Sequence, residues 1–313
     1  METLYEECRP DYMSEHWVKQ PRPIYRRSIG GDRYYWFRNA QGKIQGSPSV
    51  TTVLGVFNKT MLEKWKVEKG FEYFTILDHL ANYGTLFHHI AFLPWSQPET
   101  WKMLSYKVAR ENYIRDFVSR VCPHIEPTKA YIDSSTKGNW FAQVDDDLVC
   151  WLKFIKEYDV VPLACELSLA SERIGIAGTL DMPCMMNFNR KRVMAIVDIK
   201  TSRSGFFEDH GIQLNICREL LIDNFHIEGF EPQEIMLFNW RPSGEFGERK
   251  NWTDDESVKR KSALMPKIAE AWFTPKDKEI VRLKEGFDWQ SDFTETTTTM
   301  TQLEKLFAKE TTI

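Results

Sequence analysis

The first half of the chain carries apolar residues at helical spacing, at about every third or fourth position. This pattern predicts three helices, over Thr60–Phe92, Glu99–Val121 and Asp145–Tyr158. The first has an apolar stripe that we expect to face the core, formed by Leu62, Trp65, Val67, Phe71 and Phe74. Pro94 and Pro98 are expected to end it, because proline lacks the amide proton that a helix interior needs.

The segment before these helices has a different pattern. Residues 1–30 are polar, aromatic and interrupted by prolines, so we expect a loosely packed N-terminal arm. The runs RYYWF and SVTTVLGVF flank the turn-like NAQGK and predict a β-hairpin with Gly42 near its turn. The second strand is expected to continue into a helix around Thr51–Val56.

The second half of the chain, after Pro162, has the pattern of strands. Three successive strands are predicted in LACELSLAS, IAGTLDMPCMMNF and RVMAIVDIK, then a helix over Glu208–Asp223, a strand in EIMLFNW and a helix over Val258–Phe273. This order indicates an α/β or α+β core with a helical N-terminal layer. We divide the chain into the arm (1–30), a hairpin and helical part (31–160), a strand-rich core (161–275) and a C-terminal tail (276–313).

Composition and charge place few limits on function. The chain has 313 residues, a formal net charge of -4 and a pI near 6.0. These values argue against a protein held on nucleic acid by bulk charge alone. They do not exclude a DNA enzyme, because bound divalent cations would reverse the charge of a local cleft. Aromatic residues make up 13% of the chain, enough both to fill a core and to stack on unpaired bases.

The six cysteines are scattered without a CxxC pair, a spacing that fits neither a zinc site nor an iron–sulfur cluster. Cys150, Cys165 and Cys184 lie in apolar runs and are predicted to be buried free thiols, which suits a reducing compartment. No apolar run is long enough to cross a membrane, and the N-terminus lacks a signal-peptide pattern. We therefore expect a cytoplasmic protein without a membrane partner.

The strand RVMAIVDIK ends in an acid and a base. Side chains alternate along a strand, so Asp198 and Lys200 are predicted to share one face. The run Val193–Val197 is apolar throughout, as in a strand buried on both faces. A carboxylate at the end of such a strand needs a partner or a metal ion. The alternative is that the strand simply emerges into solvent at Asp198.

A second acid, Asp181 in GIAGTLDM, also follows an apolar stretch. It precedes Asp198 by 198 − 181 = 17 residues, a separation that suits a hairpin returning one acid beside the other. The small residues Ala177 and Gly178 would let another backbone approach closely. Two adjacent carboxylates repel unless a cation lies between them, and Mg²⁺ or Mn²⁺ is the natural counterion. A solvated hairpin edge with scattered acids is the other interpretation.

Three further residues could complete such a site. Glu166, one strand earlier, is either a third acid near the metal or the partner of an arginine. His88 follows Gly84 by four residues on one helix face, and its imidazole could reach a metal, preferentially Mn²⁺. Gln213, on the helix after the third strand, could hold Lys200 or a phosphate oxygen.

Candidates for contact with DNA lie in the N-terminal half. The hydroxyls of Ser49 and Thr51 suit either phosphate contacts or the capping of a turn. Trp36, Tyr35 and Trp65 are candidates for base stacking, and each has core packing as its alternative.

The ordered set GTxxH, E…GxAGTxD, DIKT and a helical glutamine resembles the PD-(D/E)XK nuclease superfamily, in particular its RecB-like exonuclease branch. SPSVTTVLGVF followed by LEKW, upstream of GTLFH, is similar to the phage and mitochondrial genome-maintenance exonucleases of that branch. The resemblance extends from about Tyr34 to Trp240, most of the chain. It implies a restriction-endonuclease-like core, with a mixed central sheet flanked by helices.

The resemblance also implies roles for particular residues. His88, Asp181 and Asp198 would bind Mg²⁺ or Mn²⁺ with the Ile199 carbonyl, and Lys200 would be the catalytic lysine. Gln213 matches the glutamine of a QxxxY motif, but Cys217 stands at the tyrosine position, which puts that contact in doubt. The expected activity is hydrolysis of single-stranded DNA or DNA ends by an exonuclease with a metal-activated water and no iron–sulfur cluster.

Two other classes of function remain open at this stage. One is a non-catalytic DNA-end-binding partner that keeps the nuclease fold, although the intact Asp181, Asp198 and Lys200 favour the enzyme. The other is an α/β scaffold without a nucleic-acid role. Metal-dependent turnover and salt-dependent DNA binding would distinguish the three.

Overall fold

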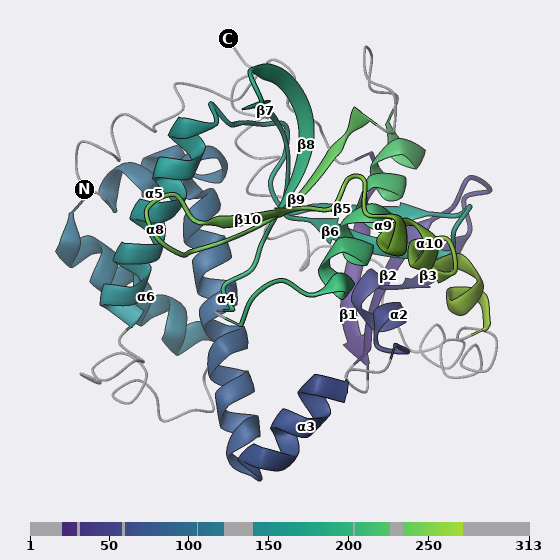
Figure 1. Cartoon of the computed structure of the whole chain (residues 1–313), viewed down its shortest axis with the longest axis horizontal. Helices are drawn as coiled ribbons and strands as arrows, with labels where there is room; N and C mark the ends of the chain where they lie inside the picture. Colours follow the sequence, from purple (N-terminus) through teal and green to yellow (C-terminus); the bar gives the residue numbers. More distant parts are fainter. Residues whose placement is uncertain are drawn as a thin grey trace.

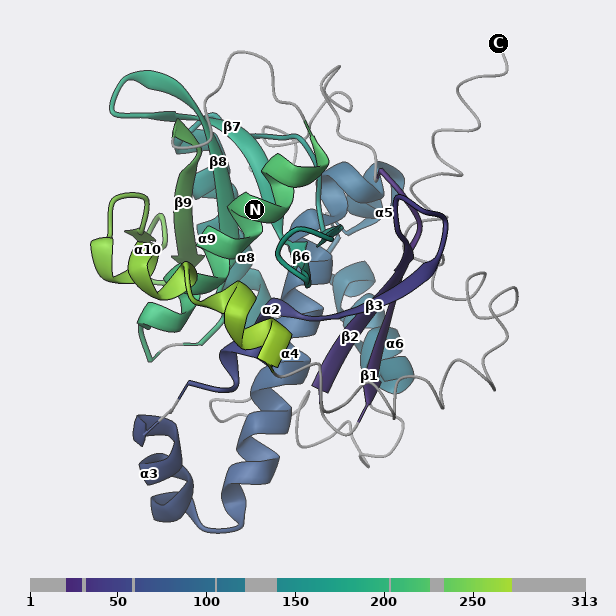
Figure 2. The ribbon, with the colours of Figure 1, turned by 90° about the vertical axis from the view of Figure 1, so that its right-hand side faces the viewer.

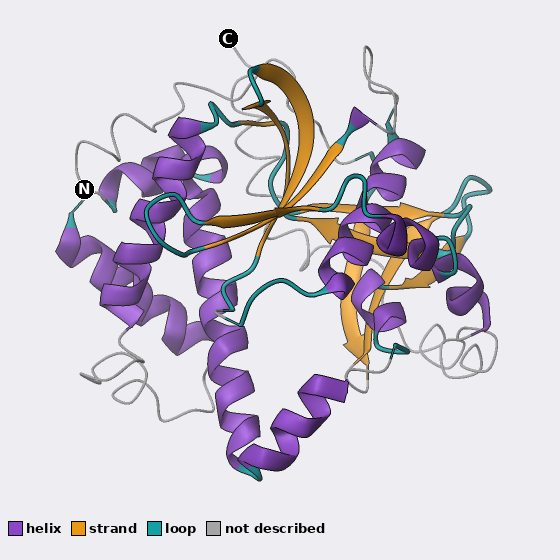
Figure 3. Cartoon of the chain, in the orientation of Figure 1, coloured by secondary structure: helices purple, strands orange, loops and turns teal. Residues whose placement is uncertain are grey.

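A mixed five-stranded sheet forms the centre of the molecule, with helices on both sides of it (Figures 1 and 3). The structure is a computed structural model that describes residues 21–29, 32–57, 60–104, 106–121, 140–202, 204–225 and 234–271. The expected C-terminal tail and most of the expected arm lie outside these residues. The predicted α/β architecture with a helical N-terminal region is confirmed.

The central sheet has the strand order β10-β9-β8-β7-β4. Its strands are β4 (Val161–Pro162), β7 (Met182–Phe188), β8 (Lys191–Ile199), β9 (Met236–Arg241) and β10 (Glu248–Asn251). Strand β8 pairs antiparallel with β7 and parallel with β9, which makes the sheet mixed. β10 was not predicted, because its sequence ERKN is fully exposed and carries no apolar alternation.

The apolar run of β8 is explained by two cores, one on each face of the sheet. Ala195, Val197 and Ile199 pack into a core with helices α4 (Glu72–Ser96), α6 (Lys107–Val121) and α8 (Trp140–Glu157). Met194 and Ile196 face the opposite core, with α2 (Val50–Leu54), α9 (Glu208–Asn224) and α10 (Glu256–Ser262). A strand covered on both faces needs apolar side chains at every position.

The three predicted strands of the second half are in fact four. The run IAGTLDMPCMMNF divides at Asp181 into β6 (Ile176–Leu180), which pairs with β5 (Leu167–Ser171), and β7, which pairs with β8. The chain changes sheets at this residue, where the Asp181 carbonyl accepts a hydrogen bond from the Glu166 amide (2.9 Å). The prediction of one continuous strand was wrong because both halves are apolar and only their partners differ.

Part of the expected N-terminal arm is ordered as a strand. β1 (Ile24–Ile29) pairs antiparallel with β2 (Asp32–Arg38), which in turn pairs with β3 (Ile44–Pro48). Gly42 lies in the turn before β3 with φ 72°, as predicted. The second hairpin strand ends at Pro48, and the run SVTTVLGVF contains the whole of helix α2, which confirms the helix expected around Thr51–Val56.

The predicted helix Thr60–Phe92 is divided into α3 (Thr60–Lys69) and α4, and α4 continues through Pro94 to Ser96. The expectation that the proline ends the helix was wrong, since near a C-terminal end a single missing hydrogen bond is tolerated. The α3–α4 hairpin projects from the rest of the molecule (Figures 1 and 2). Its predicted apolar stripe is therefore not in the core: Val67 is 83% exposed and Phe71 92%.

The remaining helices follow the sequence pattern with two interruptions. The predicted helix Glu99–Val121 consists of α5 (Pro98–Met103) and α6, and the predicted helix Val258–Phe273 is interrupted after α10 and resumes over residues 265–271. α8 and α9 agree closely with Asp145–Tyr158 and Glu208–Asp223. None of the helices in the described ranges combines the length and the apolar character needed to span a bilayer.

Four cysteines fall within the described residues, and all are buried free thiols: Cys150, Cys165, Cys184 and Cys217. The prediction made for the first three is thus confirmed.

His79 on α4 gives the fold a specific sensitivity to acid. Burial lowers its pKa, and its Nε2 accepts a hydrogen bond from Trp140 Nε1 (3.2 Å), which requires an unprotonated nitrogen. The unfolded chain takes up this proton near pH 6.5 and the folded chain only at lower pH. The contribution of His79 to the free energy of unfolding is therefore fully present above pH 6.5 and is lost progressively as the pH falls below it.

We expect the urea midpoint to fall when the pH is lowered from about 7.5 to about 5.5, around the ordinary histidine pKa. It should fall less in His79→Gln, whose amide oxygen can accept from Trp140 without titrating. Equal falls in the two proteins would show that His79 does not contribute.

Candidate metal and catalytic site

All six chemically distinctive residues meet at the C-terminal end of β8, and four of them come from other segments of the chain. α4 supplies His88, the segment before β5 supplies Glu166, and the joint between β6 and β7 supplies Asp181. Asp198 belongs to β8 and Lys200 follows it directly, while α9 supplies the sixth residue, Gln213. β8 is apolar up to this point because it is buried, and its first polar residues fall where the sheet gives way to the loop before α9.

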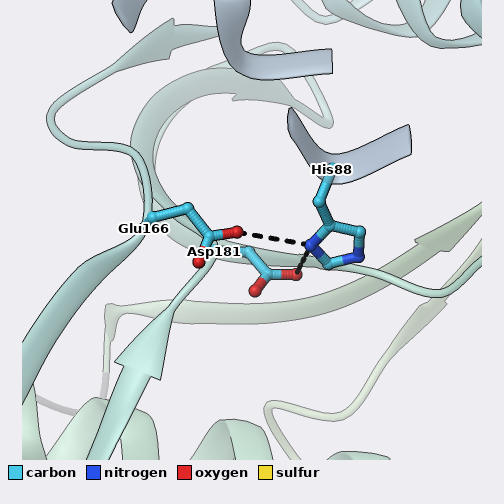
Figure 4. Close-up of side chains that lie close together, drawn as sticks. All are labelled: His88, Glu166 and Asp181. Atoms are coloured by element: carbon cyan, nitrogen blue, oxygen red, sulfur yellow. Dashed lines mark hydrogen bonds and ion pairs between the residues drawn. The ribbon is translucent and has the colours of Figure 1, made fainter. Parts of the chain in front are cut away.

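His88, Glu166 and Asp181 form one compact group (Figure 4). His88 Nδ1 lies 3.4 Å from Glu166 Oε1 and 3.6 Å from Asp181 Oδ2. One ligand atom from each of the three residues lies within 4.8 Å of the other two. Glu166 therefore lies beside His88 and Asp181, where it can act as the third acid that the sequence left open.

The orientation of the His88 ring follows from its other nitrogen. Nε2 lies 3.1 Å from the Ile199 carbonyl oxygen. A carbonyl can only accept, so Nε2 carries a proton. Nδ1 then faces the two carboxylates, as an N–H donor in the imidazolium and with a lone pair in the neutral ring. The Ile199 carbonyl, which the resemblance expects as a metal ligand, accepts this hydrogen bond.

Asp181 is fixed against the end of β8 by a backbone contact. Its Oδ2 accepts a hydrogen bond from the Ile199 amide (2.8 Å), next to Asp198. The register of β7 and β8 agrees with this contact, because Met182, which follows Asp181, is paired with Val197, which precedes Asp198. The hairpin thus returns Asp198 beside Asp181, as the 17-residue separation predicted.

Asp198, Lys200 and Gln213 form a closed triangle of polar contacts. Lys200 Nζ lies 2.7 Å from Asp198 Oδ2 and donates to Gln213 Oε1 (3.2 Å). Gln213 Nε2 donates to Asp198 Oδ1 (3.2 Å). The predicted common face of Asp198 and Lys200 is confirmed, and the glutamine holds the lysine. Asp198 lies outside the compact group of His88, Glu166 and Asp181.

Burial and neighbouring charges both shift the pKa values of the acids and bases in this site. Burial raises the pKa of Asp181 to about 7, with the repulsion of Asp198 and Glu166 adding to it and the attraction of His88 opposing it. Burial lowers the pKa of His88, but Asp181, Glu166 and Asp198 outweigh it and raise the value to about 9. Three acids in so small a volume therefore need positive charge beside them.

These residues fit a divalent metal ion. Two carboxylates and an imidazole nitrogen on neighbouring elements are the donor set that Mn²⁺ accepts readily and Mg²⁺ accepts through its oxygens. The donors are already held close together by the Ile199 backbone, which bonds to both His88 and Asp181. Without the ion, the cations beside these acids within the described part of the chain are the imidazolium of His88 and the ammonium of Lys200.

Glu166 has a backbone conformation that most side chains avoid. Its φ is 52°, in the left-handed region. Such strain persists only where the surrounding contacts impose it, and it is found disproportionately at functional sites. Here the amide of Glu166 is bonded to the Asp181 carbonyl, which brings the two acids together at the cost of that conformation.

Gly84 sets the approach of α4 to the end of β8. A Cβ atom at this position would lie 3.2 Å from Thr201 Oγ1, closer than ordinary contact. Gly84 is one helical turn before His88, so anything that pushes the helix away here also withdraws the imidazole.

We expect Gly84→Leu to lower any metal-dependent activity of the protein at least about tenfold, because a shift of about 1 Å at reacting groups can cost about 100-fold. Gly84→Ala should have little effect, because Thr201 Oγ1 can rotate and alanine favours the helix by about 1 kcal/mol. Metal affinity and thermal midpoints of both variants check this. Equal metal affinity in Gly84→Leu and the wild type would contradict it.

The candidates for DNA contact have different surroundings. Ser49 is buried and caps α2, where its Oγ accepts from the Thr52 amide (2.9 Å), so the capping alternative is confirmed. Thr51 is exposed beside it, and Trp65 is partly exposed on α3. Tyr35 and Trp36 are buried in the small sheet, which makes them packing residues and not surfaces for stacking.

One residue of the site was not predicted from the sequence. Asn239 on β9 is fully buried, and its Nδ2 lies 2.5 Å from Asp198 Oδ2. The signal was present in the run MLFNW, where an amide within an apolar strand needs a buried partner.

No protein-family model matches the chain, and no curated protein sequence matches it.

Proposed function

We propose that this protein is a metal-dependent DNA nuclease with the restriction-endonuclease-like core of the PD-(D/E)XK superfamily. One observation carries the proposal: Asp181, Asp198 and Lys200, whose motifs resemble that superfamily, lie at one end of β8 together with His88 and Glu166. The parallel pairing of β8 with β9 beside the antiparallel β7–β8 hairpin is also consistent with such a core.

Each residue has a definite part in the proposed reaction. His88, Glu166 and Asp181 would hold Mg²⁺ or Mn²⁺, and Asp198, the second acid of the resemblance, would join them from β8. When bound, the ion supplies a Lewis acid for a phosphate oxygen and lowers the pKa of a coordinated water. Gln213 keeps Lys200 and Asp198 in a fixed relation through its two hydrogen bonds.

Lys200 acts as a cation rather than as a base. Burial lowers its pKa, but the attraction of Asp198 and Asp181 outweighs it, so the pKa lies above the usual value. The ammonium therefore keeps its proton at neutral pH. It can donate hydrogen bonds to a phosphate oxygen and to the attacking water, and it stabilises the negative charge that develops in the transition state.

The class of substrate follows from the resemblance to the RecB-like branch. We infer an exonuclease that acts on single-stranded DNA or DNA ends. Thr51 and Trp65, which are exposed or partly exposed, remain the proposed contacts to the strand.

The proposal is tested with end-labelled single-stranded and double-stranded DNA, incubated with Mg²⁺, with Mn²⁺ or with a chelator. Metal-dependent shortening of one labelled end is expected, and chelation should abolish it. Asp181→Asn serves as the inactive reference on the same fold. Cleavage that persists unchanged in the chelator or in Asp181→Asn would overturn the assignment.

A further inference from the structure

Two buried residues, Asn239 and Trp252, position Asp198, and both lie outside the group of His88, Glu166 and Asp181. The parallel register of β8 and β9 places Asn239 directly beside Asp198. Asn239 Nδ2 donates to Asp198 Oδ2 (2.5 Å), and Asn239 Oδ1 accepts from Trp252 Nε1 (2.7 Å). The chain of contacts Trp252–Asn239–Asp198 therefore runs from the loop after β10 to the site.

The direction of these bonds is determined by chemistry. An indole N–H can only donate, so the asparagine must turn its carbonyl oxygen towards Trp252. Its NH₂ group is then forced to face Asp198, where an ionised carboxylate can only accept. Without the indole proton the amide could rotate, and its oxygen would meet the carboxylate with repulsion.

The indole itself has little freedom to move. Trp252 is buried, and its amide bonds to the Leu237 carbonyl (2.9 Å). Its ring lies so close to α9 that a Cβ atom on Gly211 would come within 2.7 Å of Trp252 Cδ2. Gly211 lies on the same helix as Gln213, so the ring limits how closely α9 approaches the sheet.

We propose that Asn239 and Trp252 are positioning residues that set the orientation of the Asp198 carboxylate, and with it the positions of Lys200 and Gln213. This inference rests on the proposed nuclease function. One oxygen of Asp198 is shared by Asn239 and Lys200 and the other is bound by Gln213. A carboxylate held by donors on both oxygens presents a defined geometry to a metal ion without reorganisation.

The test uses tryptophan-to-phenylalanine exchanges, which remove an indole proton and keep an aromatic ring. Trp252→Phe breaks the contact to Asn239. Trp151→Phe is the matched control, because Trp151 is also buried and its Nε1 bonds to the Ala91 carbonyl (3.1 Å) in the opposite core. Asn239→Leu, of similar volume, removes the amide and is the second test variant.

Mn²⁺ affinity is measured without DNA, from the electron paramagnetic resonance signal of the free ion, together with thermal midpoints. We expect Trp252→Phe and Asn239→Leu to bind Mn²⁺ about 10–100-fold more weakly, the usual effect of losing such a partner. Trp151→Phe should bind as the wild type does. In cleavage assays, kcat of Trp252→Phe should recover at high Mn²⁺, and its KM for DNA should not change.

Each other outcome has a distinct meaning. Wild-type Mn²⁺ affinity in Trp252→Phe would overturn the positioning role while leaving the nuclease proposal intact. Equal losses in Trp252→Phe and Trp151→Phe would also overturn it, since the effect would then be one of general packing. A wild-type protein that binds no Mn²⁺ would overturn both proposals.

Discussion

Replacing Lys200 with methionine is expected to lower the rate of DNA cleavage by about 10²–10³-fold, the usual cost of losing one preorganised donor to a developing negative charge. Methionine keeps most of the length of the side chain but removes the ammonium that contacts Asp198 and Gln213. Cleavage of end-labelled DNA at saturating Mn²⁺ measures the effect. Lys191→Met, at the exposed start of the same strand, is the matched control and should cleave normally.

A second variant separates catalysis from charge balance. Lys200→Met leaves Asp198 without its cation, which by itself can destabilise the fold. Adding Asp198→Asn removes that uncompensated charge, so the thermal midpoint of the double variant should recover towards that of the wild type. Activity should not recover. Cleavage by Lys200→Met at the wild-type rate, or restored by the second substitution, would show that Lys200 has no chemical role.

Trp240→Ala is expected to have the largest effect on stability, lowering the free energy of unfolding by about 3–5 kcal/mol. Trp240 is fully buried, with ring centroids 4.8 Å from Trp151 and 5.9 Å from Phe154. Its Nε1 also donates to the Phe246 carbonyl (3.1 Å). Truncation would leave a large cavity between the central sheet and helices α4 and α8, which the rigid sheet cannot close.

The comparison is with Trp65→Ala on the projecting hairpin. Trp65 is only partly buried, so its loss should cost about 1 kcal/mol, the centre of the range for point substitutions. Urea unfolding followed by circular dichroism gives both values. Similar losses in the two variants would mean that the aromatic cluster around Trp240 does not dominate the core.

Much of the fold is local in origin and could be predicted from periodicity. α8 has a strong apolar face, although its start was predicted at Asp145 instead of Trp140, and the end of α9 was predicted within one residue. The clearest error is the burial expected for the first predicted helix. The stripe of α3 and α4 has the right spacing for burial, yet Phe71 and Val67 are exposed, because periodicity indicates an amphipathic helix and not whether another element covers it.

The sequence by itself determined which residues of β8 share a face, because the alternation of a strand is a property of the backbone. It thereby placed Asp198 beside Lys200, and the short hairpin placed Asp181 beside them. Only the tertiary structure decided that Glu166 joins His88 and Asp181, and that Asn239 and Trp252 hold Asp198. Those contacts join residues from separate elements, and their distances depend on how β8 pairs with β9 and how α4 crosses the sheet. No local pattern in the chain shows which of these elements meet.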